Sequence, residues 1–224
     1  MLKAEDVQKE YKRGGTIIRA LIDINLEINA GEMVSIQGPT ACGKTTLLNI
    51  LSGLDIPDDG KVFLDGENIS RASESRLSSI RSQKVGFVFQ DFNLIDTLSA
   101  IENVTALLWP TPLHNKDIEK RALAALRDVN LLERKDHVPR QLSGGEKQRV
   151  AVARAIVHQP RVIFADEPTG NLDPESGREL MDLFVQLNKD YKTTIIIVTH
   201  DENIANKYGR KKIKMSKGKI TSVS

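Results

Sequence analysis

Apolar and polar residues alternate along residues 17–37, in two blocks that are separated by Ala30 and Gly31. Alternation with a period of two is typical of a strand with one buried face, so this stretch predicts a strand, a turn and a second strand over residues 33–37. Residues 46–54 carry apolar side chains at helical spacing and include a glycine stop signal near their end. The order strand, glycine-rich loop, helix is therefore predicted for this part of the chain.

A turn signal and several apolar runs predict further strands. Residues 61–69 indicate a hairpin around an Asp-Gly pair, because both turn residues tolerate the positive φ that a two-residue turn requires. Residues 85–89 predict a buried strand. The continuous apolar runs 162–165 and 194–198 are typical of parallel strands that are covered on both faces.

Helical spacing takes over in about residues 91–159. Residues 118–134 predict one helix of this part, with its apolar positions on a single face. Between the last two apolar strands, Asp173 supplies an N-cap and Pro174 a first-turn residue for a helix through about Lys189. The chain is therefore predicted to be an α/β protein with a helical insertion.

Composition narrows the classes of function. A chain of 224 residues, 40% of them hydrophobic, can bury the core of a globular domain. Its 32 Lys and Arg against 30 Asp and Glu leave a net charge of +2, too small for a protein that neutralises many phosphates, so no nucleic-acid partner is expected. The single cysteine excludes an internal disulfide and the N-terminus lacks the apolar core of a signal peptide, which predicts a cytosolic location.

Two features bear on membranes. No apolar run approaches the roughly 20 residues of a membrane-spanning helix, so a membrane role is expected to come through a partner. The basic run at residues 210–215 alternates with apolar residues. Lysines on an edge strand hinder pairing with another chain, so we expect an edge strand here rather than a lipid-binding segment.

Residues 38–46, GPTACGKTT, fit the phosphate-binding pattern G-x-x-x-x-G-K-[ST]. In such a loop the backbone N–H groups point at the phosphates, and the following helix adds a favourable N-terminal dipole. Lys44 would reach the β- and γ-phosphates, and Thr45 would offer its hydroxyl to Mg²⁺. The strand before the loop and the helix after it favour a nucleotide site over a chance match. The residues predicted to surround the phosphates are Gly38, Pro39, Thr40, Ala41, Cys42, Gly43, Lys44, Thr45 and Thr46.

Two acids end the apolar strand at residues 162–165. Asp166 would hold Mg²⁺, usually through water, and Glu167 would orient or deprotonate the attacking water. Acids also begin ordinary loops, so the pair indicates catalysis only in company with the phosphate loop.

A second anion site is predicted where residues 142–148, LSGGEKQ, begin a helix. Ser143 offers a hydroxyl, Gly144 and Gly145 offer free N–H groups, and the helix adds its dipole. Two anion-binding helix ends beside one complete nucleotide site indicate that each supplies half of a shared site. That arrangement requires a dimer with nucleotide between the subunits.

With these motifs in this order, the sequence resembles the ATP-binding-cassette ATPases over essentially its whole length, with LSGGE in place of LSGGQ. The resemblance implies a P-loop NTPase fold with a RecA-like core, an antiparallel β subdomain and an α-helical subdomain. In one nucleotide-binding domain, 1–224, the core would comprise about residues 1–90 and 160–224 and the helical subdomain about residues 91–159. It also implies ATP and Mg²⁺ as cofactors and ATP hydrolysis by a pair of identical subunits.

Four further residues match the family's pattern. Tyr11 matches the aromatic residue that stacks on adenine, Gln90 the glutamine that links the Mg²⁺ site to the transport partner. Asp173 matches the aspartate that contacts the opposite subunit, and His200 the histidine that contacts the γ-phosphate. Three of them also have a structural explanation: Tyr11 as a half-buried strand aromatic, Gln90 as a strand-end polar residue and His200 as a loop histidine. The implied catalytic residues are Glu167, His200, Lys44 and Gln90, and the implied metal-binding residues are Thr45, Gln90 and Asp166.

Three residues depart from the family's usual pattern. Glu146 ends the signature in place of glutamine, which other members tolerate, and Ala41 replaces a common glycine at a permissive loop position. Cys42 replaces a small hydroxyl residue. Backbone N–H donors and Lys44 near the Cys42 thiol are expected to lower its pKa and make it more reactive. One hypothesis is therefore that oxidation of Cys42 switches the ATPase off. The other is that Cys42 is only a small residue that fits the loop.

Residues 90–104, QDFNLIDTLSAIENV, resemble cassettes of the lipoprotein-releasing, macrolide-efflux and antimicrobial-peptide export group. The resemblance implies a separate permease with few spans, driven by transmitted motion, and a protein held on the inner face of the cell membrane through that permease. Phe92, Leu94 and Ile95 are expected to form an exposed docking patch, or else to pack beneath the helical subdomain. A regulatory cassette of the cell-division type is the alternative; a nucleotide-binding scaffold without turnover is disfavoured by Glu167 and His200.

Overall fold

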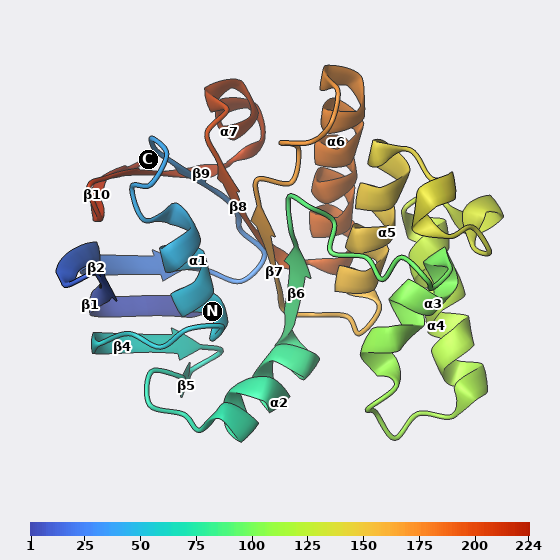
Figure 1. Ribbon diagram of the computed structural model, residues 1–224, viewed down its shortest axis with the longest axis horizontal. Coiled ribbons are helices and arrows are strands. Elements are labelled where there is room, and N and C mark those ends of the chain that lie inside the picture. The colour runs from blue at the N-terminus through green and yellow to red at the C-terminus, as the bar shows by residue number, and fades with distance from the viewer.

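Across residues 1–224, all of which the computed structural model describes except the side chain of Arg13, the strands form two sheets (Figure 1). The antiparallel sheet has the order β2-β1-β4-β5. Its strands are β1 (Leu2–Arg13), β2 (Thr16–Ile28), β4 (Asp59–Leu64) and β5 (Glu67–Asn68). The predicted hairpin is confirmed: β4 pairs with β5 around Asp65 (φ 57°) and Gly66 (φ 80°), the two left-handed residues of a tight turn.

The larger sheet has the order β10-β9-β3-β8-β7-β6. Its strands are β3 (Met33–Gln37), β6 (Val85–Val88), β7 (Val162–Asp166), β8 (Thr194–Thr199), β9 (Lys211–Ser216) and β10 (Lys219–Val223). All pairings are parallel except that of β10 with β9. The α/β class is confirmed, and the predicted strands at β3, β6, β7 and β8 are present.

The prediction of an edge strand at residues 210–215 is wrong. Strand β9 pairs with β3 on one side and with β10 on the other, so β10 forms the edge. Ile213 and Met215 are buried, whereas Lys214 between them is exposed. The alternation of this run therefore reflects one buried face rather than protection of an edge.

The helices lie on both sides of the larger sheet (Figure 1). They are α1 (Lys44–Ser52), α2 (Glu74–Lys84), α3 (Ala100–Thr105), α4 (Asn115–Asp128), α5 (Gly144–Ile156), α6 (Pro174–Tyr191) and α7 (Glu202–Tyr208), with short 3₁₀ turns η1 (Ala106–Leu108), η2 (Leu132–Arg134) and η3 (Pro139–Gln141). Two predicted helices differ in extent. Helix α1 begins at Lys44, and the helix predicted for 118–134 ends at Asp128, because Asn130 takes a left-handed φ of 57° before η2. No described helix is long and apolar enough to cross a bilayer.

Successive residues of the central strands enter two different cores. Val162, Phe164, Ile196 and Val198 join the cluster on the α1 side. Their neighbours Ile163, Ala165, Ile195 and Ile197 join the cluster that includes α5 and α6. Burial on both faces explains why these strands are continuously apolar, and it places the carboxyl ends of β3, β7 and β8 side by side along one edge of the sheet.

Strand β6 packs so closely on α5 that Gly86 has no room for a side chain. A Cβ at this position would lie 2.4 Å from the carbonyl oxygen of Ala155. We expect Gly86→Ala to lower the free energy of unfolding by about 1–3 kcal/mol, because backbone rather than a flexible side chain would have to move. Urea denaturation followed by circular dichroism measures the change.

Gly177 is the matched control within α6. Its Cβ would meet only Thr169 at 3.6 Å, an ordinary contact, so Gly177→Ala should leave stability unchanged or raise it by up to about 1 kcal/mol through helix propensity. Equal destabilisation by both substitutions would contradict the close packing of β6 on α5.

Candidate nucleotide-binding site

The glycine-rich loop joins β3 to α1, as predicted. Gly43 has a φ of 105°, and a Cβ there would lie 2.4 Å from the carbonyl oxygen of Ala20, so only glycine fits. Ala41 has a φ of 61°, a left-handed conformation that costs a residue with a Cβ about 1–2 kcal/mol. The usual glycine would take this conformation without that cost.

Lys44 lies inside the loop and is only 7% exposed. Its Nζ donates to the carbonyl oxygens of Gly38 at 2.8 Å and Pro39 at 3.1 Å. The loop thus surrounds a positive charge at the N-terminus of α1, where the helix dipole also favours an anion.

Thr45 and Asp166 meet although 121 residues separate them. The Thr45 hydroxyl donates to Asp166 Oδ1 at 3.3 Å. Burial raises the pKa of the Asp166 carboxyl above its usual range and the charge of Glu167 adds to this, whereas the Thr45 hydrogen bond and Lys44 oppose it. A hydroxyl and a carboxylate side by side are oxygen donors of the kind that Mg²⁺ prefers.

Glu167 and His200 form a second contact at the same edge. Glu167 Oε2 accepts hydrogen bonds from His200 Nδ1 at 2.9 Å and from the His200 backbone N–H at 3.3 Å. The Glu167 side chain is 17% exposed and that of His200 is 68% exposed. A mostly buried carboxylate is therefore held by a histidine that faces solvent, beside the phosphate loop.

Gln90 lies against residues that follow β7 rather than against the Thr45–Asp166 pair. Its Nε2 donates to Asn171 Oδ1 at 3.3 Å, and Asn171 Nδ2 donates to the Gln90 carbonyl oxygen at 3.1 Å and to Asp91 Oδ1 at 2.9 Å. Asn171 was missed as a candidate. Its place two residues before Asp173, which matches the family's pattern, is a signal that could have indicated it.

Ser143 caps α5 as predicted. Its hydroxyl accepts from the Glu146 N–H at 3.2 Å, and Glu146 Oε2 accepts from the Ser143 N–H at 2.8 Å. The Ser143 backbone N–H is also the main cause that lowers the pKa of the Glu146 carboxyl. Because this capping box uses only the acceptor oxygens of Glu146, the departure from glutamine fits the helix start.

The signature residues and the phosphate loop belong to different layers of one chain. Helix α1 packs on one face of the larger sheet and α5 on the other (Figure 1). Asp173 caps α6 by accepting from the N–H groups of Glu175 and Ser176, both at 3.0 Å, and its side chain is exposed. Within one chain, Ser143, Gly145 and Asp173 thus do not surround the phosphate loop.

Tyr11 stands beside the start of α1 and is 39% exposed. Its hydroxyl donates to Asp55 Oδ2 at 2.8 Å, and Lys9 Nζ lies 5.4 Å from the ring centroid. Burial, followed by Asp55, raises the pKa of the phenol, while the Thr46 hydroxyl lowers it, which places Tyr11 next to the phosphate loop.

The Cys42 side chain is 4% exposed and belongs to the hydrophobic cluster on the α1 side. A Cβ on Gly38 would lie 2.7 Å from its Sγ. The thiol thus fills the interior of the loop, and its burial favours the hypothesis of a small residue that fits over that of an oxidant-accessible switch.

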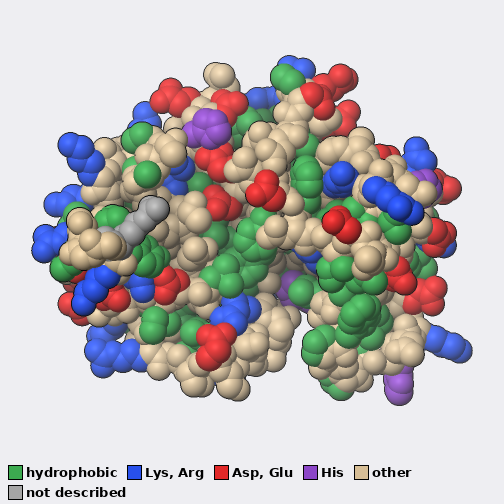
Figure 2. All heavy atoms as spheres, in the orientation of Figure 1, with side chains coloured by type: hydrophobic (Ala, Val, Ile, Leu, Met, Phe, Trp, Pro, Cys, Tyr) green, Lys and Arg blue, Asp and Glu red, His purple; other side chains and the backbone are tan. Residues whose placement is uncertain are grey.

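Phe92, Leu94 and Ile95, which follow Gln90, were expected to form an exposed patch or to pack beneath the helical subdomain. Of the three, only Ile95 is exposed, at 49%. Phe92 and Leu94 are half-buried, and Leu94 packs on the core. Buried Asn103 shapes this loop by donating to the carbonyl oxygens of Ile95, Leu98 and Ser99. Figure 2 shows hydrophobic side chains on the right side of the hollow at the lower edge of the molecule, where Figure 1 places α3 and α4.

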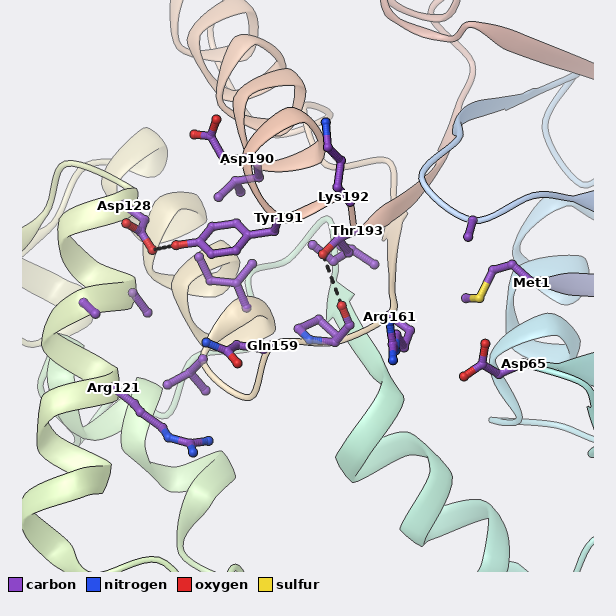
Figure 3. A pocket seen from close by; sticks show the side chains of 18 residues that line it. Met1, Asp65, Arg121, Asp128, Gln159, Arg161, Asp190, Tyr191, Lys192 and Thr193 are labelled. Atoms are coloured by element: carbon purple, nitrogen blue, oxygen red, sulfur yellow. Dashed lines mark hydrogen bonds between the residues drawn. The ribbon is translucent and has the colours of Figure 1, made fainter.

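A cavity of about 630 Å³ lies elsewhere in the molecule (Figure 3). Residues that precede strands line it, among them Ala30, Arg161 and Thr193, so it opens at the amino ends of the strands, away from the phosphate loop. Beside it the Tyr191 hydroxyl donates to Asp128, which ties the end of α6 to the end of α4. This bond is the main cause that raises the pKa of Tyr191 to about 12.

Comparison with known proteins agrees with this geometry. The model of the ABC transporter family matches residues 21–170. The ATP-binding protein MJ0796 of Methanocaldococcus jannaschii is 44% identical, with 98% of this chain and 95% of that protein covered. Its dimeric structure in a post-hydrolysis state with ADP and Pi has a TM-score of 0.91 to this chain, at 42% identity, with 100% and 98% of the two chains covered.

Two further relatives have partner systems in their names. The lipoprotein-releasing system ATP-binding protein LolD of Bacteroides fragilis is 45% identical over 92% of this chain and 93% of its own. CbiO1 of Clostridium perfringens, described as part of the ABC transporter complex cbiONQ, has a TM-score of 0.90 at 33% identity, with 100% and 87% covered. The chain belongs to the ABC transporter family, in which it is an ATP-binding subunit and an ATPase.

Proposed function

We propose that two copies of this chain bind two ATP molecules between them and hydrolyse them to drive a membrane permease. The observation that carries this proposal is the convergence of the phosphate loop, the Asp166–Glu167 pair and His200 at the carboxyl ends of β3, β7 and β8. Ligands of parallel sheets bind at this edge. MJ0796 is dimeric in its structure, which supports the shared site.

Each residue then has a role in one of the two half-sites. Tyr11 stacks on adenine, and the N–H groups of residues 38–46 with Lys44 hold the phosphates. Glu167 orients and deprotonates the attacking water, and His200, which Glu167 positions, contacts the γ-phosphate. The half-site from the other chain consists of Ser143, Gly144, Gly145 and Asp173.

Thr45 and Asp166 are the proposed Mg²⁺ residues of this chain, and their contact fits an oxygen-binding cation. The metal would neutralise charge on the β- and γ-phosphates when bound. Gln90, the third proposed ligand, bonds to Asn171, so its part would require a change of partner. We further propose residues 1–90 and 160–224 as the approximate core and 91–159 as the helical subdomain.

The proposed partner is a permease of the kind used for export or extraction of lipoprotein, peptide or drug, in which motion is transmitted rather than a tunnel opened. Support comes from the similarity to LolD and from the loop after Gln90, where Asn103 holds Ile95 in an exposed position. Through it the ATPase would lie on the inner face of the cell membrane. A cell-division cassette, which would use the same surface on a different membrane partner, is the second candidate.

Affinity purification tests the partner. We expect tagged protein from gently solubilised native membranes to recover a permease with few spans and a large external domain, and Ile95→Ser to lower this recovery at least about fivefold, because an apolar anchor is lost. Val223→Ser is the control, since Val223 is also 49% exposed but lies on the edge strand β10. Recovery of a division protein would favour the second candidate, and recovery of no membrane protein would overturn both.

A further inference from the structure

The segment between β6 and α3 crosses α5 (Figure 1), and two side chains of α5 bond to it. Gln148 Nε2 donates to the carbonyl oxygen of Phe89 at 3.1 Å. The Arg154 guanidinium donates to the carbonyl oxygens of Phe92, at 2.8 Å, and of Asn93. Both ends of residues 89–93, the segment that contains Gln90, are therefore attached to one helix.

The turn that Arg154 holds is conformationally unfavourable. Phe92 and Asn93 have φ values of 60° and 49°. Asparagine enters this left-handed region readily, but a bulky residue such as Phe92 does so only at a cost in free energy. The planar guanidinium donates from two different nitrogens in a fixed fork, whereas an ammonium would have to reach both carbonyl oxygens from a single nitrogen. Arg154 thus stabilises a turn that the backbone alone would not favour.

Gln148 extends the attachment to the strand that ends in the acids. It is fully buried, and its Nε2 donates a second hydrogen bond to the carbonyl oxygen of Pro168 at 2.8 Å. Pro168 follows Glu167 directly. The Oε1 atom of Gln148 is buried without a hydrogen-bond partner among the described residues. One amide therefore joins α5, the start of the Gln90 segment and the residue after Glu167.

We propose that Gln148 and Arg154 are positioning residues that make α5 and residues 89–93 move as one unit. Ser143 caps this helix, so a displacement of Gln90 at a chain's own nucleotide also displaces the signature residues that contact the nucleotide of the other chain. The inference rests on the roles proposed above for Gln90 and Ser143, and it supplies the physical connection between them.

The test uses the full chain with Glu167→Gln, so that hydrolysis does not disperse the dimer. We expect Arg154→Met to raise the ATP concentration that gives half-maximal dimerisation about tenfold, as expected for loss of charge-assisted hydrogen bonds. Sedimentation velocity measures the dimer, and a fluorescent ATP analogue measures affinity in the monomer, which should not change. Arg154→Lys keeps the charge but replaces the two-nitrogen fork by a single nitrogen, so it should raise the half-maximal ATP concentration by less than Arg154→Met does. It carries the test if Arg154→Met does not fold.

Arg149→Met is the matched control on the same helix. Arg149 donates to the carbonyl oxygen of Val129 and to Glu179, but not to residues 89–93. Its loss should lower thermal stability without changing the ATP dependence of dimerisation. An equal shift from Arg149→Met and Arg154→Met would mean that α5 is merely destabilised, and the inference would be wrong.

A double-mutant cycle with Gln90→Ala separates transmission from packing. If Gln90 acts through the Arg154 attachment, the double variant should be little worse than the poorer single variant, whereas independent effects add. Additive effects would overturn the inference while leaving the proposed function in place. Failure of the Glu167→Gln parent to dimerise with MgATP would overturn the proposed function and this inference together.

Discussion

Replacing Glu167 by glutamine is expected to lower the rate of ATP hydrolysis about 10²- to 10⁴-fold, the range for loss of a general base. The amide keeps the size of the carboxylate, and its oxygen can still accept hydrogen bonds from His200. In the wild-type protein Glu167 accepts one from His200 Nδ1 and one from the His200 backbone N–H. It cannot take a proton from water. ATP binding should persist, because Lys44 and the loop are untouched, so a stable dimer should accumulate with MgATP.

Phosphate release measures the rate, and sedimentation velocity with and without MgATP measures the dimer. Glu175→Gln is the control: Glu175 is an exposed acid in the first turn of α6 that does not touch His200. A monomer at saturating MgATP would contradict the shared site, and nearly full activity would show that Glu167 is not the base.

The elements that sequence patterns missed are those whose burial does not follow a regular period. Strand β1 is the clearest example, because register shifts between Ala4 and Val7 and between Val7 and Lys9 interrupt its alternation. Lys9 itself occupies an inward position at 7% exposure, where its ammonium pairs with Asp55 at 3.0 Å. A charged residue on the buried face makes such a strand look like a loop in the sequence.

The site could be predicted to the extent that its residues are neighbours in the chain. Lys44 and Thr45 occupy a loop whose residue spacing indicates phosphate binding. The pairing of the strands brings the ends of β7 and β8 to that loop. Contacts such as Gln90 with Asn171, 81 residues apart, depend on how loops from different layers meet. Arg154 gave no signal either, since an arginine at helical spacing is ordinarily a solvated one.

The exposure of residues after Gln90 illustrates the same limit. Of the apolar residues Phe92, Leu94 and Ile95, the last two are consecutive, so the sequence has no regular period that indicates which of them is exposed. Only the left-handed turn at Phe92 and Asn93 and the bonds from Asn103 decide that Ile95 points outward while Leu94 packs inward. Both depend on partners that lie far along the chain or on another helix.

Mixing two inactive variants is expected to restore ATPase activity if each nucleotide lies between chains. Lys44→Ala removes the charge that holds the phosphates, and Ser143→Glu places a carboxylate at the N-cap of α5, where it repels phosphate yet suits the helix dipole. Each variant alone should lose at least about 100-fold in activity. A mixed dimer has one site with both defects and one with neither, so equal mixing should restore about a quarter of wild-type activity, given random pairing of isologous subunits.

Ser99→Glu is the matched control for the serine substitution, because Ser99 and Glu102 form the same capping box on α3. That variant should retain activity alone, since the loss expected for Ser143→Glu depends on phosphate at the end of α5 and not on the change of cap. Titrating one inactive variant against the other should give a maximum at equal amounts, with ATP hydrolysis as the measurement. Activity that stays at the level of the separate variants at every ratio would mean that Lys44 and Ser143 do not serve one nucleotide from two chains.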